Sequence, residues 1–284
     1  MKMDIQILKE EELYLRFIIK DVTSSYINTL RRMMNTEVPI MAIDEVNFIV
    51  NDSALYDEMI AHRLALTPLK TDLQSYELKE KCTCKGVGCA KCQLVFSLKV
   101  KGPNTVYASD LKSQDPKVIP VHARMPITKL SDNQVLEIEA TAKLGIGKEH
   151  IKFSPGLIYY QAYPEIKLKG EIPNPEKYKD ICPTHVFEVE NNKLVIKNLL
   201  NCDMCMACVE ANPDDSIEVR PSKTDFILTI EAYGQLSARQ IFEEAIHIFD
   251  EKLDSFNKKI KEGEESKISK ITERIKIKKK AQPI

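Results

Sequence analysis

The sequence has no apolar run that approaches the ~20 residues needed to cross a bilayer, so we expect no membrane-spanning segment. Its first residues lack the apolar stretch and the small-residue cleavage site of a signal peptide, and we therefore expect a cytoplasmic protein. There is also no excess of one charge, because 41 basic and 42 acidic residues give a formal net charge of −1. That balance argues against a chain that coats nucleic acid by charge alone.

Motifs for catalysis are missing as well. The sequence contains no Asp-x-Asp pair, so it shows no two-metal site for nucleotidyl transfer. It contains no Gly-x4-Gly-Lys-Ser/Thr phosphate loop, and Gly145-Ile146-Gly147 lacks the third glycine of a dinucleotide fingerprint. The five histidines are scattered. We expect no active site in this chain.

Cysteine, in contrast, is abundant and clustered. Four of the eight cysteines fall within 82–92, and in a reducing compartment such a cluster favours metal binding over disulfides. Four thiolates so close in sequence can close on one ion only if the backbone turns tightly, which Gly86 and Gly88 permit. The spacing predicts a closed, structural zinc site. Free thiols or an iron–sulfur cluster are the alternatives. The predicted zinc ligands are Cys82, Cys84, Cys89 and Cys92.

A second cluster has a different spacing. Cys202-x2-Cys205-x2-Cys208 is the compact triplet that wraps three corners of a cubane iron–sulfur cluster, and Cys182-Pro183 offers the fourth ligand. These four cysteines predict one cluster, either four-iron (4Fe-4S) or three-iron (3Fe-4S), with a second zinc as the alternative. In ferredoxins with two clusters, cysteines would stand at Tyr178 and Asn212, so the second cluster is deleted here.

Hydrophobic periodicity predicts both strands and helices. Apolar alternation indicates strands in the first twenty residues, at 46–50, 94–100, 135–140, 157–163, 216–220 and 226–233, and a hairpin over 186–197. An apolar stripe at helical spacing runs from Tyr26 to Met34. A longer helix begins at Ser237, where Gln240 completes a capping box, and its stripe continues to Ile260. The stretch 164–178 reads as a linker, and the tail 252–280 is basic, either a solvated end or a contact surface.

The segment 26–46 closely resembles the assembly segment of the α-like subunits of cellular RNA polymerases. The family pattern is Asn-x-Leu-Arg-Arg, then a proline, then Ala-x-Asp-Glu-Val. The matching positions are Asn28, Leu30, Arg31, Arg32, Pro39, Ala42, Asp44, Glu45 and Val46. The segment 62–69 looks like a second family segment, and the loop 82–92 is similar to the zinc loop of the eukaryotic third-largest subunit. A ferredoxin-like insertion is a trait of many archaeal members, although many of those carry two clusters.

The resemblance implies an α+β architecture in three parts. An α-subunit-like assembly domain of a sheet plus helices would comprise 1–45 and 224–284. A β-rich insert domain with the zinc loop would comprise 46–164 and 214–223. A ferredoxin-like iron–sulfur module would occupy 165–213.

The resemblance also implies a non-catalytic assembly platform of DNA-directed RNA polymerase. It would form a heterodimer with the smaller subunit L, recruit the small subunit N and dock the two catalytic subunits, meeting DNA only through the complex. The expected interface residues are Tyr26, Ile27, Leu30, Arg31, Arg32, Met33, Phe242, Phe249, Leu253 and Phe256. The alternative, an iron–sulfur electron-transfer subunit of an oxidoreductase, lacks a second cluster and any flavin or nicotinamide motif.

Overall fold

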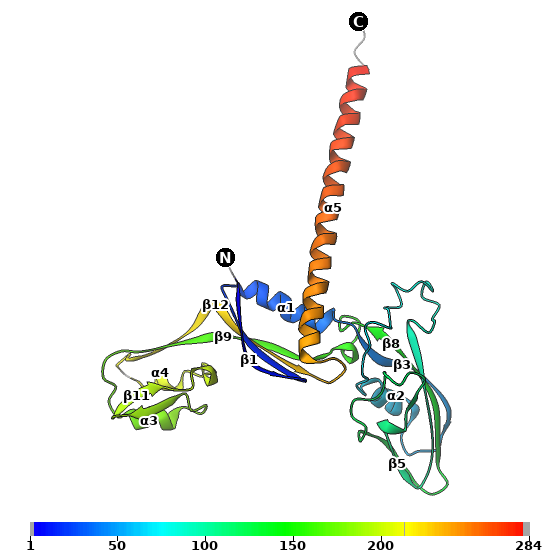
Figure 1. The fold of residues 1–284 in the computed structure, drawn as a ribbon, viewed down its shortest axis with the longest axis horizontal. Coiled ribbons are helices and arrows are strands. Elements are labelled where there is room, and N and C mark those ends of the chain that lie inside the picture. The colour runs from blue at the N-terminus through cyan, green and yellow to red at the C-terminus, as the bar shows by residue number, and fades with distance from the viewer. Residues whose placement is uncertain (1–2, 213, 281–284) are drawn as a thin grey trace. The chain divides into compact units, whose positions relative to one another are not determined.

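The computed structural model describes residues 3–212 and 214–280, with side chains through residue 263 (Figure 1). The chain divides into two compact units, one formed by 1–31 and 156–233 and the other by 32–155 and 234–284. Sheets and helices occur in both, so the predicted α+β class is confirmed. Helix α1 (Ser24–Thr36) crosses the boundary between the units.

The first unit contains a four-stranded antiparallel sheet in the order β1-β2-β12-β9. Its strands are β1 (Asp4–Glu11), β2 (Tyr14–Lys20), β9 (Gly156–Leu168) and β12 (Ile217–Ala232). Leu15, Phe17 and Ile19 alternate along β2 and are buried, so one face of the sheet is a core face. Two strands predicted at 216–220 and 226–233 are one strand, with a register shift after Pro221, which has no N–H for the ladder.

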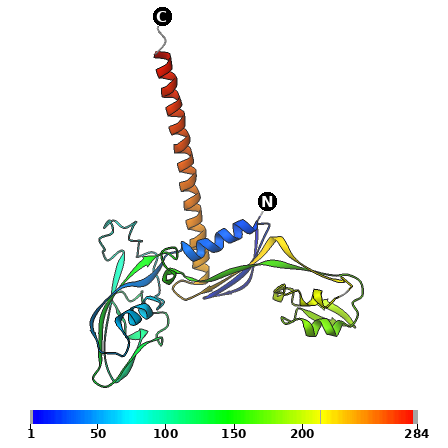
Figure 2. The same cartoon turned by 180° about the vertical axis from the view of Figure 1, so that it is seen from behind.

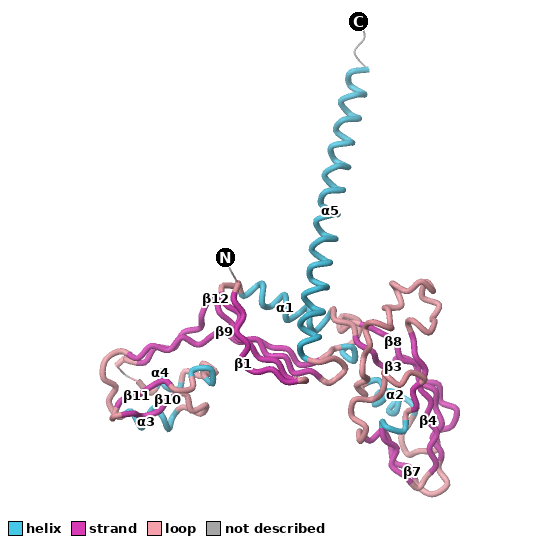
Figure 3. Tube along the Cα trace, in the orientation of Figure 1, coloured by secondary structure: helices cyan, strands magenta, loops and turns pink. Residues whose placement is uncertain are grey.

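Strands β9 and β12 pair along most of their length and lead to a small module (Figure 3). Leu168 pairs with Ile217, so the stretch predicted as a linker from Pro164 onward begins as a strand. Strands β9 and β12, which include 156–164 and 217–223, belong to the same sheet as β1 and β2, whereas the domain bounds expected from the resemblance put 156–164 and 214–223 in the insert domain. The predicted end of the module, Pro213, lies outside the described residues.

The module contains α3 (Pro175–Ile181), the hairpin β10 (Phe187–Glu190) and β11 (Lys193–Ile196), the short turn η3 (Leu199–Asn201) and α4 (Ala207–Glu210). The predicted hairpin is confirmed. Asn191 and Asn192 have φ of 49° and 62°, the left-handed backbone that a two-residue hairpin turn requires. Pro175 occupies the start of α3, where its fixed φ suits a helix and its missing N–H costs nothing.

The second unit contains a sheet in the order β3-β8-β4-β6 and a two-stranded sheet of β5 and β7. The bounds are β3 (Ile40–Asn51), β4 (Gln93–Lys101), β5 (Asn104–Tyr107), β6 (Lys112–Ser113), β7 (Pro126–Leu130) and β8 (Val135–Gly145). Helix α2 (Asp57–Ala65) lies against β3 (Figure 2). It buries Ile60 and Leu64 in the core. The turns η1 (Ala108–Asp110) and η2 (Ile151–Phe153) also lie in this unit.

Helix α5 (Ala238–Lys280) begins as predicted. The backbone N–H of Ser237 donates to Gln240 Oε1 at 2.9 Å, and the N–H of Gln240 donates to Ser237 Oγ at 3.2 Å, so the capping box is confirmed. Side chains of the basic tail beyond residue 263 lie outside the described part of the chain. Across 3–212 and 214–280, no helix is both long and apolar enough to cross a membrane.

Candidate metal centres

The four cysteines of the loop 82–92 converge on one point. Their sulfur atoms all lie within 4.8 Å of one another. The Sγ atoms of Cys82 and Cys89 are 3.6 Å apart, as are those of Cys84 and Cys92, and Cys89 and Cys92 are separated by 3.9 Å. A zinc ion with four thiolates at ~2.3 Å places neighbouring sulfurs about 3.8 Å apart, by tetrahedral geometry. The quartet therefore fits a single tetrahedral cation.

The backbone makes this convergence possible through two tight turns. The N–H of Lys85 donates to the Cys82 carbonyl at 3.0 Å, and the N–H of Cys92 donates to the Cys89 carbonyl at 2.9 Å. Gly86 and Gly88 have φ of 84° and 103°, as their predicted role in the turn requires. At Gly88 a Cβ would lie 2.4 Å from Gln93 Oε1, so this glycine also allows a close approach.

The surroundings shift the pKa values of two thiols of this quartet in opposite directions. Hydrogen bonding from the backbone N–H of Gly88 lowers the pKa of Cys84 to about 6, which favours its thiolate. Burial raises the pKa of Cys92 to about 12, because the thiolate would lose its hydration. A bound divalent cation would stabilise the thiolate of Cys92 as well, since metal binding requires deprotonated sulfur.

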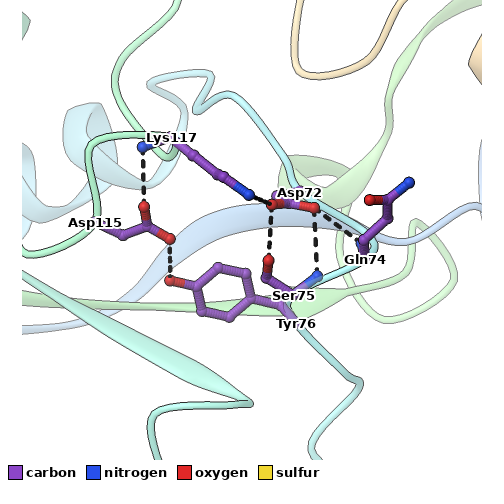
Figure 4. Close-up of polar contacts among 6 residues, drawn as sticks. All are labelled: Asp72, Gln74, Ser75, Tyr76, Asp115 and Lys117. Atoms are coloured by element: carbon purple, nitrogen blue, oxygen red, sulfur yellow. Dashed lines mark hydrogen bonds and ion pairs between the residues drawn. The ribbon is translucent and has the colours of Figure 1, made fainter.

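A polar network holds the chain just before the cysteine loop (Figure 4). The Tyr76 hydroxyl donates to Asp115 Oδ2 at 2.9 Å, and burial together with this bond raises the pKa of Tyr76 to about 12. Asp72 accepts from Ser75 Oγ at 2.8 Å and from Lys117 Nζ at 3.0 Å, and these bonds lower its pKa to about 2. These residues join the segment 72–76 to the loop 115–117. Sequence reasoning missed the network because its members are distant in the chain.

The second cysteine quartet comes from separate elements of the module. Cys182 follows α3, Cys202 follows η3, Cys205 stands in the next loop, and Cys208 lies in α4. Three of the four are buried in the module's hydrophobic core, whereas Cys205 is exposed. Burial raises the pKa of Cys202 and of Cys208.

All four of these cysteines line one pocket, together with apolar side chains such as Ile166 and Val219. Their spacing differs from that of the first quartet. Among the residues that the structure describes, only Cys82, Cys84, Cys89 and Cys92 bring three or more ligand atoms of Cys, His, Asp or Glu within 4.8 Å of one another. The second quartet does not reach that close spacing. An iron–sulfur cluster would bond its cysteines to separate irons, so it would not require their sulfurs to lie so near one another.

The positions where a second cluster would need cysteines are filled by other side chains. Tyr178 and Asn212 are both buried, and the Tyr178 hydroxyl lies 3.5 Å from the Asn212 side-chain amide. The hydroxyl of Ser216 lies 3.2 Å from the same amide. A phenol ring and polar groups therefore occupy this region.

The expected interface residues of α1 differ in exposure. Ile27, Leu30 and Met33 are buried within the chain, Tyr26 and Arg31 are half-buried, and Arg32 is exposed. The guanidinium of Arg31 donates from Nε and Nη2 to Asn28 Oδ1 at 3.2 and 3.0 Å. The apolar residues of α1 thus serve the fold of this chain in the structure.

Along α5 the apolar stripe passes from buried to exposed. Ile241 and Ala245 are fully buried, and Phe242 and Phe249 are half-buried. Further along, the exposed fractions of the last three members are 44% for Leu253, 60% for Phe256 and 44% for Ile260. An amphipathic helix that leaves this stripe in water indicates a surface meant for another apolar element.

An ion-pair cluster surrounds Asp44, which the sequence placed in the assembly segment. Its carboxylate lies 2.8 Å from Lys143 Nζ and 2.6 Å from Lys152 Nζ. Burial raises the pKa of Asp44, but the hydrogen bonds from the two lysines outweigh burial, and the net shift is downward. This cluster fastens η2 to β3 and β8, so we assign Asp44 a structural role.

Comparison with known proteins finds relatives that are all RNA polymerase subunits. Residues 41–159 match the family model described as the RNA polymerase Rpb3/RpoA insert domain. The chain is similar to DNA-directed RNA polymerase subunit Rpo3 of Archaeoglobus fulgidus, with 38% identity over 91% of this chain and 98% of that protein. It is also similar to the subunits of the same name from Methanosphaera stadtmanae, 36% identical over 92% and 100% of the two chains, and Pyrococcus furiosus, 36% identical over 89% and 95%.

Proposed function

Because this chain belongs to the family of DNA-directed RNA polymerase subunit Rpo3, we propose that it is a non-catalytic platform on which the polymerase assembles in the cytoplasm. The observation that carries the proposal is the similarity to these relatives over 89–92% of this chain. The partly exposed apolar stripe of α5 adds to it. The electron-transfer alternative is unsupported by these relatives.

We propose that a smaller subunit of the L type covers the exposed stripe of α5. Leu253, Phe256 and Ile260 recur at spacings of three and four residues, so they form one face of the helix. A helix of the partner with a matching apolar stripe would remove this face from water, at about 25 cal/mol for each Å2 of apolar surface buried. The half-buried Phe242 and Phe249 continue the same stripe toward the start of the helix.

A pair of matched variants tests this interface. Phe256→Glu places a charge in the stripe and is expected to abolish retention of the small partner. Ser255→Glu adds the same charge on the opposite side of the helix and should leave retention unchanged. Copurification of partner subunits with each full-length variant, measured by mass spectrometry, checks both. Equal retention by the two variants would contradict the proposed interface.

The remaining contacts are assigned to the other polymerase subunits. In the second half of α1, Arg32 is exposed and Arg31 is half-buried, and guanidinium groups form strong paired hydrogen bonds with carboxylates. We propose that they face the two catalytic subunits, that a small subunit N also binds this platform, and that DNA is met only through the complex. Affinity purification of the chain from its native cells should recover these subunits in stoichiometric amounts. Recovery of a redox enzyme without polymerase subunits would overturn the platform.

We further propose different groups for the two cysteine quartets. Cys82, Cys84, Cys89 and Cys92 would hold one zinc ion, a choice that the separations of 3.6 to 3.9 Å support. Cys182, Cys202, Cys205 and Cys208 would hold one iron–sulfur cluster of the 4Fe-4S or 3Fe-4S type in a ferredoxin-like module, a choice supported by their shared pocket and compact triplet. Each group would crosslink its own segment of chain, and neither takes part in nucleotidyl transfer.

The exposed ligand gives a way to remove the cluster without substituting a residue of the buried core. Cys205→Ser is expected to lose the iron and, with it, the order of the module, while the platform outside the module keeps its wild-type sequence. If the cluster serves only its module, the variant should still recover the small partner and the catalytic subunits. Loss of both iron and partners would instead show that the platform depends on the cluster. Iron analysis and copurification of the same preparation distinguish the two results.

A further inference from the structure

Arg16 occupies an unusual place in the sheet of the first unit. It lies in β2, opposite Lys9 of β1 and Thr229 of β12, so the three side chains share one face of the sheet. Thr229 is only 3% exposed, and Ile18, the next β2 residue on that face, is 4% exposed. A guanidinium that is half-buried among such neighbours is costly unless hydrogen-bond acceptors compensate it.

The acceptor that Arg16 finds is a backbone carbonyl of the module. Its Nη2 donates to the carbonyl of Leu200 at 3.1 Å, across 184 positions of sequence. Its Nε is buried without a hydrogen-bond partner, and within the described residues Arg16 forms no ion pair. The carbonyl of Leu200 therefore contributes a large share of what holds this cation in place.

Leu200 belongs to a hydrogen-bonded turn that ends at a cysteine of the second quartet. The N–H of Asn201 donates to the Asn198 carbonyl at 3.0 Å, and the N–H of Cys202 donates to the Leu199 carbonyl at 3.1 Å. The carbonyl that Arg16 binds is thus two residues from the Cys202 sulfur and lies within the same turn. A fixed position for that carbonyl therefore restricts the position of Cys202.

The same turn is tied to the other ligand segment. Asn198 Nδ2 donates to the His185 carbonyl at 3.0 Å, and the Asn198 N–H donates to the Val186 carbonyl at 3.1 Å. The N–H of His185 in turn donates to the Cys182 carbonyl at 3.2 Å. A continuous set of hydrogen bonds therefore runs from Cys182 to the turn and from the turn to Arg16 on β2.

We propose that Arg16 is a positioning residue that fastens the cluster-binding turn 198–202 to β2 and so couples retention of the cluster to the order of the sheet. This inference rests on the proposed iron–sulfur cluster. If the cluster is lost and the turn loosens, Arg16 loses its acceptor and β2 carries an uncompensated cation. Coupling of this kind is reciprocal, so removing Arg16 must also weaken the hold on the cluster.

Substitutions at Arg16 and Lys9 test the coupling in the full-length chain, purified without oxygen together with the subunits it retains. Arg16→Met removes the donor, Arg16→Lys keeps a cationic donor, and Lys9→Met removes a neighbouring cation that is ion-paired at the surface with Glu11. We expect Arg16→Met to lose iron to a chelator several-fold faster than wild type, with faster hydrogen exchange at 198–202. Arg16→Lys should be intermediate and Lys9→Met unchanged, and zinc should stay constant in all three.

Two results would overturn the coupling. One is wild-type iron loss and wild-type exchange at 198–202 in Arg16→Met. The other is faster exchange spread evenly over β1, β2 and β12 with no added effect at 198–202, which would make Arg16 a residue of the sheet alone. Wild-type protein that never contains iron would overturn the cluster itself. In that case exchange at 198–202 would still decide whether Arg16 holds the turn.

Discussion

The two cysteine quartets differ in how much of the chain must fold before their thiols can meet. The first lies within the loop 82–92, where two turns bring all four sulfurs within 4.8 Å of one another and three of their pairs to 3.6–3.9 Å. The second spans 182–208 and needs α3, η3 and α4 to be placed around one pocket. A local site can form on an already folded domain, whereas the second site and its module must form together.

The two quartets also differ in whether their cysteines belong to a hydrophobic core. Cys182, Cys202 and Cys208 are members of the module's hydrophobic core. The core of the second unit is built from residues such as Phe96 and Ile138 and includes none of the four cysteines of the first quartet. The free energy of metal binding contributes to folding only where folding needs the metal. The stability of the module is therefore expected to depend on its cluster far more than the stability of the insert domain depends on zinc.

Removing a core ligand should have the largest effect. Cys208→Ser is expected to lose the iron and to unfold the module, because so small a core needs the crosslink. Hydrogen exchange within 175–212 should approach that of an unfolded chain, while β3, β4 and β8 stay protected. Protection of 175–212 that matches wild type in an iron-free variant would erase the contrast between the two sites.

The corresponding change in the first quartet should have a local effect. Cys84→Ser is expected to lose the zinc and to release the loop 82–92, since a three-thiolate remnant no longer closes the tetrahedron. The sheet of the second unit should keep its exchange protection, because its core does not include the quartet. Zinc analysis and exchange of β3, β4 and β8 check this, and unfolding of that sheet would show that zinc supports the whole domain.

A smaller effect is expected where side chains replace the deleted cluster. Tyr178→Phe keeps the ring and removes the hydroxyl that lies 3.5 Å from the Asn212 amide. The free energy of unfolding of the module should fall by less than about 1 kcal/mol, because 3.5 Å is long for a hydrogen bond from a hydroxyl. Tyr56→Phe, at a residue 80% exposed, is the control and should change nothing. Denaturant titration of the module's signal measures both, and a zero effect for Tyr178→Phe would show that packing alone fills the region.

The smallest effect concerns acid sensitivity beside the first quartet. The pKa of Asp72 is lowered from 3.8 to about 2, so its ionised form stabilises the fold above pH 3.8, and this contribution is lost as the pH falls through 2. Asp72→Asn should flatten the pH dependence of unfolding in that range and cost less than about 1 kcal/mol at neutral pH, because solvent screens the carboxylate. Asp132→Asn, on an exposed turn, serves as the control. An unchanged slope in Asp72→Asn would contradict the role of the network.

Local signals in the sequence predicted much of this structure. The capping box at Ser237, the asparagine turn of the module hairpin and the glycines of the cysteine loop each act over a few residues, so spacing alone reveals them. Pro221 misled the strand assignment, because a proline reads as a break, whereas pairing with β9 carries β12 through a register shift. Long-range pairing also decides which unit 214–223 joins.

The candidate sites show the same difference between local features, which the sequence predicts, and long-range contacts, which it does not. Each cysteine set could be named from spacing, because metal ligands cluster by residue type. The hydrogen bond from Arg16 to Leu200 and the network of Asp72 with Lys117 could not, since their partners are chosen by tertiary folding and ordinary residues supply them. The proposed small-subunit interface was visible as an apolar stripe, but only the structure separates its buried start from Leu253 and Phe256.

Metal content per chain tests the central contrast most directly. We would determine iron, acid-labile sulfide and zinc in full-length wild type, Cys84→Ser and Cys208→Ser, each purified without oxygen. The account predicts about one zinc and about four irons in wild type, or about three irons for the smaller cluster. Cys84→Ser should lose only zinc, and Cys208→Ser should lose only iron. Two zinc ions without iron in wild type, or loss of both metals in either variant, would contradict two independent sites of different chemistry.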